Sequence, residues 1–202
     1  MARYTGAKLR ITRRLGDLPG LTSKKGKRTQ RPGQHGATQK KLTQYAIRLE
    51  EKQKLRFNYG LSEKQLMNYI RQAKRIKGAT GYILLQLLEM RLDNVVFRLG
   101  MAPTIAAARQ LVSHKHITIN KSCVSIPSYQ CRPGDILSIE DSNASRQLVL
   151  KNLESQALSN VPQNLDFDKQ CLTAKVLGII DRNCLALRFN ELFILAFDYR
   201  QI

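Results

Sequence analysis

The sequence predicts an α+β protein with a basic extended N-terminal arm, a small helical bundle, and an inserted helix-helix-strand domain with a small antiparallel sheet. Three observations lead to this prediction. Residues 1–90 hold 21 Lys and Arg against 5 Asp and Glu, so positive charge is concentrated in the first half. Apolar residues recur at helical spacing from residue 43 to residue 113. After residue 114 their period changes to two, which is typical of strands.

The predicted arm covers residues 1–42. Asp17 is its only acidic residue, and glycines and prolines interrupt any regular element. Alone in water such a segment is expected to be largely unfolded, and to become ordered against a polyanion. The alternative is a simple solubility tail, which would not need apolar residues that could contact the following domain. The arm has six such residues: Tyr4, Leu9, Ile11, Leu15, Leu18 and Leu21.

The predicted bundle covers residues 43–90 and contains three helices. Thr43–Phe57 has helical periodicity. Ser62 and Gln65 have the spacing of a capping box, which places the start of a second helix over Glu63–Ile76. A heavily apolar stripe then predicts a third helix that ends before residue 91.

The domain that follows is expected over residues 91–189, with a core module at residues 91–141. Two helices begin this module. The apolar spacing predicts the first over Leu92–Leu99, and Gly100 follows where a left-handed residue ends a helix. Thr104 is a candidate N-cap for the second, over Ile105–Ser113.

Short strands complete the module. Ile117 and Ile119 alternate with polar residues, and the pair Asn120-Lys121 is expected to turn the chain into a strand over Cys123–Ile126. Gly134-Asp135 predicts another turn before a strand that contains Ile136, Leu137 and Ile139.

Beyond the module the pattern is weaker. Residues 142–163 are interpreted as a linker. Alternation predicts strands over 172–180 and 184–188, which would extend the sheet. By periodicity residues 190–199 fit either a strand or a helix, and Asn190 as a candidate N-cap favours the helix.

The formal net charge of +19 points to a polyanionic partner, because neutralised phosphates release condensed counterions. Nucleic acid and anionic membrane both fit this charge. The longest apolar runs, such as Leu192–Phe197, are far too short to span a bilayer, and the N-terminal basic residues do not alternate with large apolar groups. We therefore expect a nucleic acid and no membrane.

Polar residues that a small core cannot hold are the candidate RNA contacts. In the module they should line an exposed, mostly basic face, where Arg, Gln, His and Lys donors suit phosphate and ribose oxygens. The alternative is a merely solvated face. The module's candidates are Arg91, Asp93, Arg98, Arg109, Gln110, His114, Lys115, His116 and Lys121. Those of the arm and bundle are Arg3, Tyr4, Lys8, Arg10, Arg13, Arg14, Lys24, Lys25, Lys27, Arg28, Arg31, Gln34, His35, Lys40, Lys41, Lys52, Lys54, Arg56 and Arg71.

The four cysteines, Cys123, Cys131, Cys171 and Cys184, are widely spaced and form no CxxC pair. Reduced, half-buried thiols are the expected state, and a disulfide is the alternative. With the three histidines also scattered, we predict no bound zinc and no other cofactor.

Several segments resemble a known family. Arg91–Val95 (RLDNV), Ala108–Val112 (ARQLV) and Ile126–Tyr129 (IPSY), together with Arg98-Leu99-Gly100 and His116-Ile117, are similar to the RNA-binding domain named after the fourth protein of the small ribosomal subunit. Further segments resemble the same ribosomal protein in the same order, so the likeness covers roughly the whole chain. They are residues 1–6, 31–36, 48–60, 84–91, 166–169 and 190–192. Gly16–Lys25 also resembles the plastid branch of the family.

This resemblance implies a structural protein that binds small-subunit ribosomal RNA directly, nucleates assembly of the subunit body and contributes to translational accuracy. It implies neighbouring ribosomal proteins as partners and messenger RNA near the side where it enters. It also implies that residues 190–202 return to the helical bundle, and that the protein works in a ribosome of the chloroplast stroma. Some bacterial members bind zinc through N-terminal cysteines, but this chain has Leu9 and no cysteine before Cys123.

Two alternatives remain. The same domain occurs in RNA-modifying enzymes, and Arg91-Leu92-Asp93 resembles the setting of the catalytic Asp of pseudouridine synthases. Met90 precedes it here, however, and Asp93 is expected instead to cap that helix or to position Arg91. The chain also has no phosphate-cradling glycine loop and no catalytic triad pattern, so we expect no enzyme activity, and the alternative is a non-catalytic part of an RNA-modifying enzyme. The other alternative is a free RNA-binding assembly or stress factor.

Overall fold

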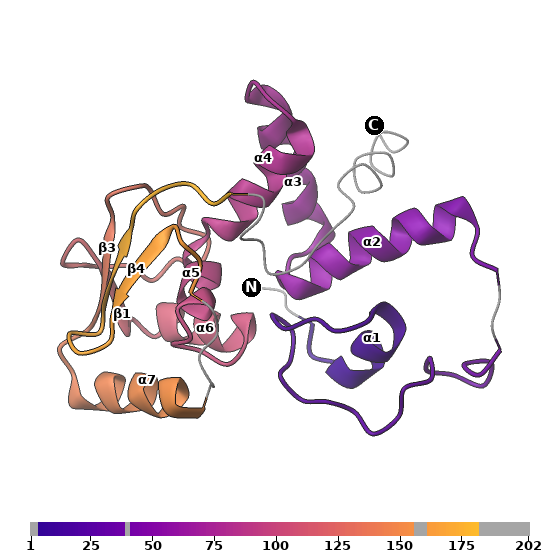
Figure 1. Ribbon diagram of the computed structural model, residues 1–202, viewed down its shortest axis with the longest axis horizontal. Coiled ribbons are helices and arrows are strands. Elements are labelled where there is room, and N and C mark those ends of the chain that lie inside the picture. Colours follow the sequence, from indigo (N-terminus) through magenta and orange to yellow (C-terminus); the bar gives the residue numbers. More distant parts are fainter. Residues whose placement is uncertain (1–3, 39–40, 156–160, 182–202) are drawn as a thin grey trace. The chain divides into compact units, whose positions relative to one another are not determined.

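The structure, a computed structural model, describes residues 4–38, 41–155 and 161–181. The chain divides into two compact units, with the boundary inside a helix between Leu84 and Leu85. Helices and one small antiparallel sheet are both present, which confirms the α+β class (Figure 1).

The first unit contains the helical bundle. Helix α2 (Gln44–Asn58) begins after Thr43, whose side chain accepts a hydrogen bond from the Ala46 amide. Helix α3 (Glu63–Arg75) begins with the predicted capping box. Helix α4 (Thr80–Glu89) follows and continues into the second unit. Each predicted helix is therefore confirmed to within one or two residues.

The arm contains a helix that the sequence analysis did not predict. Helix α1 (Lys8–Leu15) fits between two of the glycines that were expected to prevent regular structure, and Gly16 ends it with φ +92°. Ile11, Leu15, Leu18 and Leu21 are buried together against Phe57 of α2. The predicted docking of the arm's apolar residues is confirmed for these four, whereas the expectation of no regular element was wrong.

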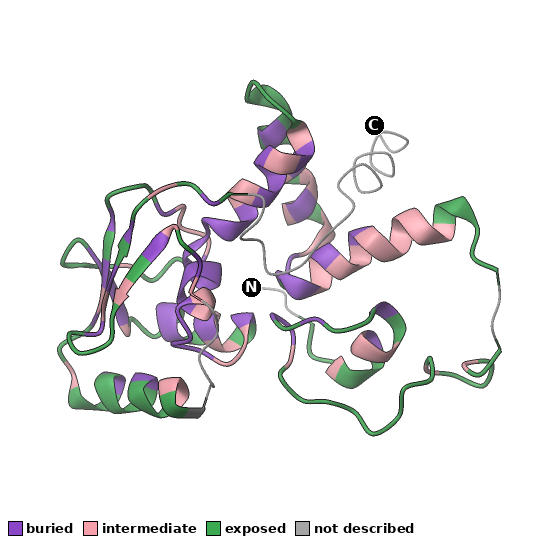
Figure 2. Cartoon of the chain, in the orientation of Figure 1, coloured by how far each residue is buried: buried purple, intermediate pink, exposed green. Residues whose placement is uncertain are grey.

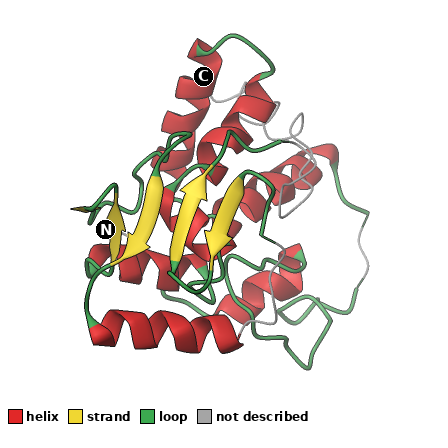
Figure 3. Cartoon of the chain, turned by 60° about the vertical axis from the view of Figure 1, so that its left-hand side comes forward, coloured by secondary structure: helices red, strands yellow, loops and turns green. Residues whose placement is uncertain are grey.

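The second unit has helices on a five-stranded antiparallel sheet (Figure 3). Helix α5 (Leu92–Arg98) and helix α6 (Ile105–Ser113) lie on one side of the sheet, as Figure 1 shows. The strands run in the order β2-β1-β3-β5-β4. Their bounds are β1 Ile117–Ile119, β2 Ser122–Cys123, β3 Ile136–Ile139, β4 Leu165–Asp168 and β5 Thr173–Val176. One apolar core joins both helices to the inner face of the sheet.

The predicted hairpin is present at β1 and β2. Asn120 and Lys121 both have positive φ, +50° and +66°, as a two-residue hairpin turn requires. Ile119 pairs with Ser122 across this turn. Strand β2 ends at Cys123, so it is shorter than the predicted Cys123–Ile126.

The region after the module differs from the prediction. Residues 142–163 were expected to be a linker, but helix α7 (Asn143–Ser155) occupies most of them. Strand β4 was not predicted. Strand β5 lies within the predicted 172–180 strand and pairs with β3, which confirms that this segment extends the sheet. The predicted strand at 184–188, the element at 190–199 and the return of residues 190–202 to the bundle lie outside the described residues.

Candidate nucleic-acid interface

Two of the predicted contact residues, Arg91 and Asp93, form a buried ion pair at the start of α5. The Arg91 guanidinium donates to both Asp93 carboxylate oxygens, from Nε to Oδ1 at 3.0 Å and from Nη2 to Oδ2 at 2.8 Å. Arg109 of α6 donates from Nε to the same Oδ2 at 2.7 Å. The Asp93 side chain is 1% exposed. The expectation that Arg91 and Asp93 line an exposed face was therefore wrong, because both belong to a buried Asp93 cluster with Arg109. The expectation that Asp93 positions Arg91 is confirmed by these hydrogen bonds.

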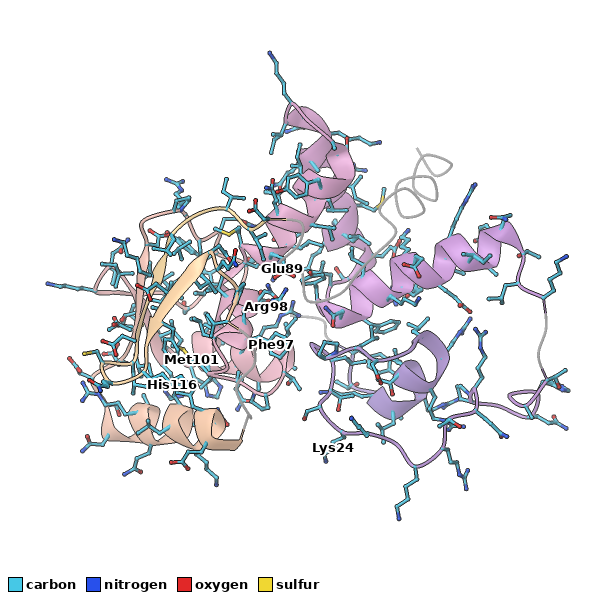
Figure 4. All side chains as sticks on the ribbon, in the orientation of Figure 1. Lys24, Glu89, Phe97, Arg98, Met101 and His116 are labelled. Atoms are coloured by element: carbon cyan, nitrogen blue, oxygen red, sulfur yellow. The ribbon has the colours of Figure 1, made fainter. Side chains whose placement is uncertain are left out.

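A second carboxylate holds Arg98 in the same way. Glu89, the last residue of α4, accepts from Arg98 Nη2 at 2.9 Å and from Nε at 3.0 Å. Asn94 donates to the Glu89 carboxylate at 2.6 Å and to its backbone carbonyl at 3.0 Å. Figure 4 labels Glu89 and Arg98, which come from α4 and α5. Glu89 and Asn94 are not among the residues predicted from the sequence. The signal for Glu89 was a lone acid at the end of an otherwise apolar helix.

The two clusters orient Arg98 and Arg109 on rigid helices. Their side chains keep 13% and 16% of their surface exposed, whereas the carboxylates they contact are 1% exposed. Arg98 makes a two-point contact with Glu89, and Arg109 donates from Nε to Asp93. A guanidinium that is already held by a carboxylate loses little further entropy when it binds a phosphate. These two arginines can thus act as preorganised phosphate donors at a rigid surface.

The Ile126–Tyr129 segment (IPSY) has a structural role at this site. Its carbonyl groups accept hydrogen bonds from the first amides of α5: Leu92 donates to Tyr129 at 2.9 Å and Asp93 donates to Pro127 at 3.1 Å. A helix N-terminus needs such partners because its first amides have none within the helix. The segment therefore fixes the helix that carries Arg98.

The remaining module candidates gather at the C-terminal end of α6 and at the β1–β2 turn. Gln110, His114, Lys115 and Lys121 are exposed. The Cys123 thiol donates to the Lys115 carbonyl at 3.8 Å, so strand β2 lies against the end of α6. His116 is half-buried, and its Nδ1 lies 2.8 Å from the hydroxyl of Ser145 on α7. The predicted exposed face is present for the first four residues and partly for His116.

The arm is the most strongly charged surface of the first unit. Its described residues 4–38 carry nine Lys and Arg against Asp17 alone. Figure 2 shows that this segment is almost entirely exposed beyond the buried cluster, and Figure 4 labels Lys24 within it. The exposed candidates here are Arg10, Arg14, Lys24, Lys25, Lys27, Arg28, Arg31, Gln34, His35 and Lys41.

Other arm candidates are less exposed or differently placed. Lys8 and Arg13 are half-buried, and Arg13 donates from Nε to the Gln30 carbonyl at 2.8 Å. The Tyr4 ring packs edge-on against Phe57, with 5.5 Å between the ring centroids, and stays 47% exposed. Arg3 and Lys40 lie outside the described residues.

The basic residues of α2 mainly serve the fold. Lys52 is buried, 1% exposed, and its ammonium group contacts Glu63. Lys54 pairs with Glu51 at 2.6 Å, and Arg56 stacks 4.7 Å from the Phe57 ring centroid. The interpretation of Lys52 as a surface RNA contact was wrong, because its charge is needed beside a carboxylate inside the unit. Arg71 on α3 is exposed, as predicted.

The described cysteines are free. Cys123 and Cys171 are exposed, and Cys131 is buried in the core of the second unit. Burial, with the nearby carboxylates of Asp135 and Asp93, raises the pKa of the Cys131 thiol to about 12. In the part of the chain that the structure describes, no three His, Cys, Asp or Glu side chains come together as metal ligands would. Cys184 lies outside that part.

Comparison with known proteins gives matches over the whole chain. The family model described as ribosomal protein S4/S9 N-terminal domain matches residues 3–89, and the one described as S4 domain matches residues 90–137. The chain is 75% identical over 202 residues to small ribosomal subunit protein uS4c of Emiliania huxleyi, with all of both chains covered. It is 59% identical over 202 residues to uS4 of Thermosynechococcus vestitus, again over all of both chains. Identity to uS4 of Picosynechococcus sp. is 61% over 200 residues, 99% of each chain.

Proposed function

Since this chain belongs to the ribosomal protein S4 family, we propose that it is a structural constituent of the small ribosomal subunit and binds small-subunit rRNA directly. The observation that carries this proposal is that the chain has both an exposed basic arm and two arginines, Arg98 and Arg109, that buried carboxylates hold in place. No helix among the described residues has the length and apolar character needed to cross a membrane.

The two surfaces support two kinds of RNA contact. The arm's closely spaced Lys and Arg neutralise phosphates over a large area, with release of counterions. Arg98 and Arg109, and the exposed residues at the end of α6, offer donors in fixed directions, which position the protein on folded RNA. We propose that the exposed members of the predicted set make these contacts, and that Arg91, Asp93 and Lys52 act only through the side chains they hold.

The family resemblance supports finer proposals. The protein would nucleate assembly of the subunit body, contribute to translational accuracy, dock against neighbouring ribosomal proteins and lie near messenger RNA where it enters. We also propose a plastid ribosome in the chloroplast stroma. Its support is the 75% identity to uS4c of Emiliania huxleyi, the 59–61% identity to cyanobacterial uS4 proteins, and the plastid-like Gly16–Lys25 segment.

An RNA-modifying enzyme is the less favoured alternative. Such an enzyme would need the Asp93 carboxylate to reach a nucleotide, but that carboxylate is buried and accepts hydrogen bonds from two arginines. The relatives named above are ribosomal proteins. We therefore propose that the chain binds RNA and performs no bond-making chemistry.

Crosslinking in cells tests the proposal against a free assembly or stress factor. Ultraviolet crosslinks from the tagged full chain should converge on one region of small-subunit rRNA. The protein should also sediment at one copy per small subunit after a moderate salt wash. Crosslinks scattered over many RNAs, or a substoichiometric and exchangeable association, would favour the free factor.

A further inference from the structure

A tight turn in the arm is built differently from the charged segment around it. In residues 33–36 the Gly36 amide donates to the Gly33 carbonyl at 3.2 Å, and Gly33 has φ +106°, a conformation strained for other residues. A Cβ atom at Gly36 would overlap the carbonyl oxygen of Arg31. The turn therefore requires glycine at both of its ends, and its backbone folds closely on itself.

Side chains from two helices hold the chain just before this turn. Arg13 of α1 donates to the Gln30 carbonyl at 2.8 Å. Arg31 pairs with Glu50 of α2, from Nη1 to Oε1 at 3.0 Å and from Nη2 to Oε2 at 3.4 Å. This two-point ion pair anchors the turn to α2, so Arg31 has a structural role in addition to any contact it makes with a phosphate.

The anchored turn presents two polar recognition groups at its tip. Gln34 and His35 occupy its two central positions, and both are exposed. Their side chains make no hydrogen bond with any residue that the structure describes. A solvated loop would need neither the glycine pair nor the anchors, so the rigid presentation of these two groups calls for a ligand.

We propose that the 33–36 turn recognises an unpaired nucleotide base of the rRNA, which stacks on His35 and forms hydrogen bonds with the Gln34 amide. An amide carries both a donor and an acceptor and so can read a base edge, and an imidazole ring offers a stacking face. The surrounding arm supplies phosphate contacts that are indifferent to sequence. The turn thus adds selectivity where the rest of the arm adds affinity. This inference rests on the proposed function, which supplies the RNA.

Binding by the full chain to two transcripts tests the inference. The probes are a transcript of plastid small-subunit rRNA and a large-subunit rRNA transcript of equal length. The double variant Gln34→Ala/His35→Ala should lose about 10- to 100-fold affinity for the small-subunit transcript, the range expected for one stacked and hydrogen-bonded base. Its affinity for the other transcript and its salt dependence should stay as in the wild type.

Matched variants separate base recognition from charge. Lys27→Gln should lower the affinity for both transcripts by the same factor. It should also reduce the slope of log affinity against log salt by roughly 0.7–0.9. His35→Phe should retain most of the affinity that His35→Ala loses, because it keeps a stacking face. An abasic residue at the crosslinked nucleotide should reproduce the loss of His35→Ala and add nothing to it.

The outcomes distinguish this inference from the proposed function. A wild-type chain that binds both transcripts equally would overturn the proposed function and the inference with it. Wild-type preference for the small-subunit transcript, left unchanged in the double variant, would overturn the inference alone. An equal loss of affinity for both transcripts in the double variant would also overturn the inference. Because both residues are exposed, urea unfolding of the double variant should match the wild type and show that any loss is local.

Discussion

At the scale of single residues, the buried acids Glu89 and Asp93 of the second unit each have charged partners. Glu89 and Asp93 are buried, and each accepts hydrogen bonds from at least one arginine. An ion pair of this kind adds little net stability by itself, because burial costs both charges their water. Removal of one partner is costly, however, since the other charge is left buried alone.

Arg98→Ala should therefore lower the free energy of unfolding by about 3 kcal/mol, because it leaves the Glu89 carboxylate buried without its guanidinium. Urea unfolding of the RNA-free protein measures this. Arg132→Ala, at an exposed arginine of the same unit, is the control and should stay within about 0.5 kcal/mol. The double variant Glu89→Gln/Arg98→Ala should recover part of the loss. An unaffected Arg98→Ala protein would show that this pair does not stabilise the fold.

Cys131 should make stability depend on pH in the alkaline range. Its pKa is raised from 9.0 to about 12 in the folded chain, so between these values the unfolded chain loses the thiol proton and the folded chain keeps it. Stability is fully present below pH 9 and falls as pH rises, by about 1.4 kcal/mol per pH unit at most.

Comparison of urea unfolding at pH 8 and pH 10 measures this dependence. Cys131→Ala should lose less stability over that interval than the wild type, and Cys123→Ala, at an exposed thiol, should lose as much as the wild type. Identical losses in the Cys131→Ala and wild-type proteins would mean that the Cys131 thiol does not contribute.

At the scale of secondary-structure elements, local signals decided what the sequence could predict. Helices α5 and α6 and the β1–β2 hairpin have their start and stop residues in the sequence: Thr104, Gly100 and Asn120-Lys121. Helix α7 has no such clear pattern, because two of its inward positions are polar. Ser145 bonds to His116, and Asn152 donates to the Met101 carbonyl at 2.9 Å, partners that only the tertiary fold supplies.

The same distinction applies to the candidate site. Arg98, Arg109 and Asp93 could be named from the sequence, but Glu89 and the pairings of Arg98 and Arg109 with carboxylates could not, because these pairings join different elements. Strand β4 could have been predicted from the sequence, because Leu165 and Phe167 alternate with two exposed aspartates, Asp166 and Asp168. Helix α1 could not be predicted for a different reason. It has only eight residues, and it depends on the tertiary contacts that bury Ile11 and Leu15.

Leu15→Ala should undock helix α1 and cost about 2–4 kcal/mol, because this leucine is 7% exposed and belongs to the cluster that packs on Phe57. Leu9→Ala, in the same helix at a position 37% exposed, is the matched control and should cost less than about 0.5 kcal/mol. Amide hydrogen exchange at residues 8–15 should accelerate in the first variant only. Equal exchange in both would mean that the cluster does not hold the helix.

At the scale of the whole molecule, the charge distribution separates the cations proposed to bind RNA from those that serve the fold. The acids Glu50, Glu51 and Glu63 pair with basic side chains within the first unit. The arm beyond residue 22 has no acid of its own up to residue 38. Arg31 of this segment pairs with Glu50, whereas Lys24, Lys25, Lys27 and Arg28 are exposed cations that we propose displace counterions from RNA.

Replacement of Lys24, Lys25, Lys27 and Arg28 by Gln should reduce the slope of log affinity against log salt by roughly 3, since each lost phosphate contact removes about 0.7–0.9. Titrations of the small-subunit transcript from 50 to 200 mM salt measure it. Lys54→Gln should leave the slope unchanged, because that ammonium group pairs with Glu51. If the quadruple variant kept the wild-type slope, these four residues of the arm would not contact RNA phosphates.

The Asp93 cluster also constrains how this chain can evolve. Substitution of Asp93 alone would remove the carboxylate that both guanidinium groups contact, and substitution of Arg109 alone would remove one of the donors to Asp93 Oδ2. Natural variation should accordingly keep Arg91, Asp93 and Arg109 as a set or exchange them together. In an alignment of relatives, these three positions should covary, because the charge at each one depends on the charges at the other two.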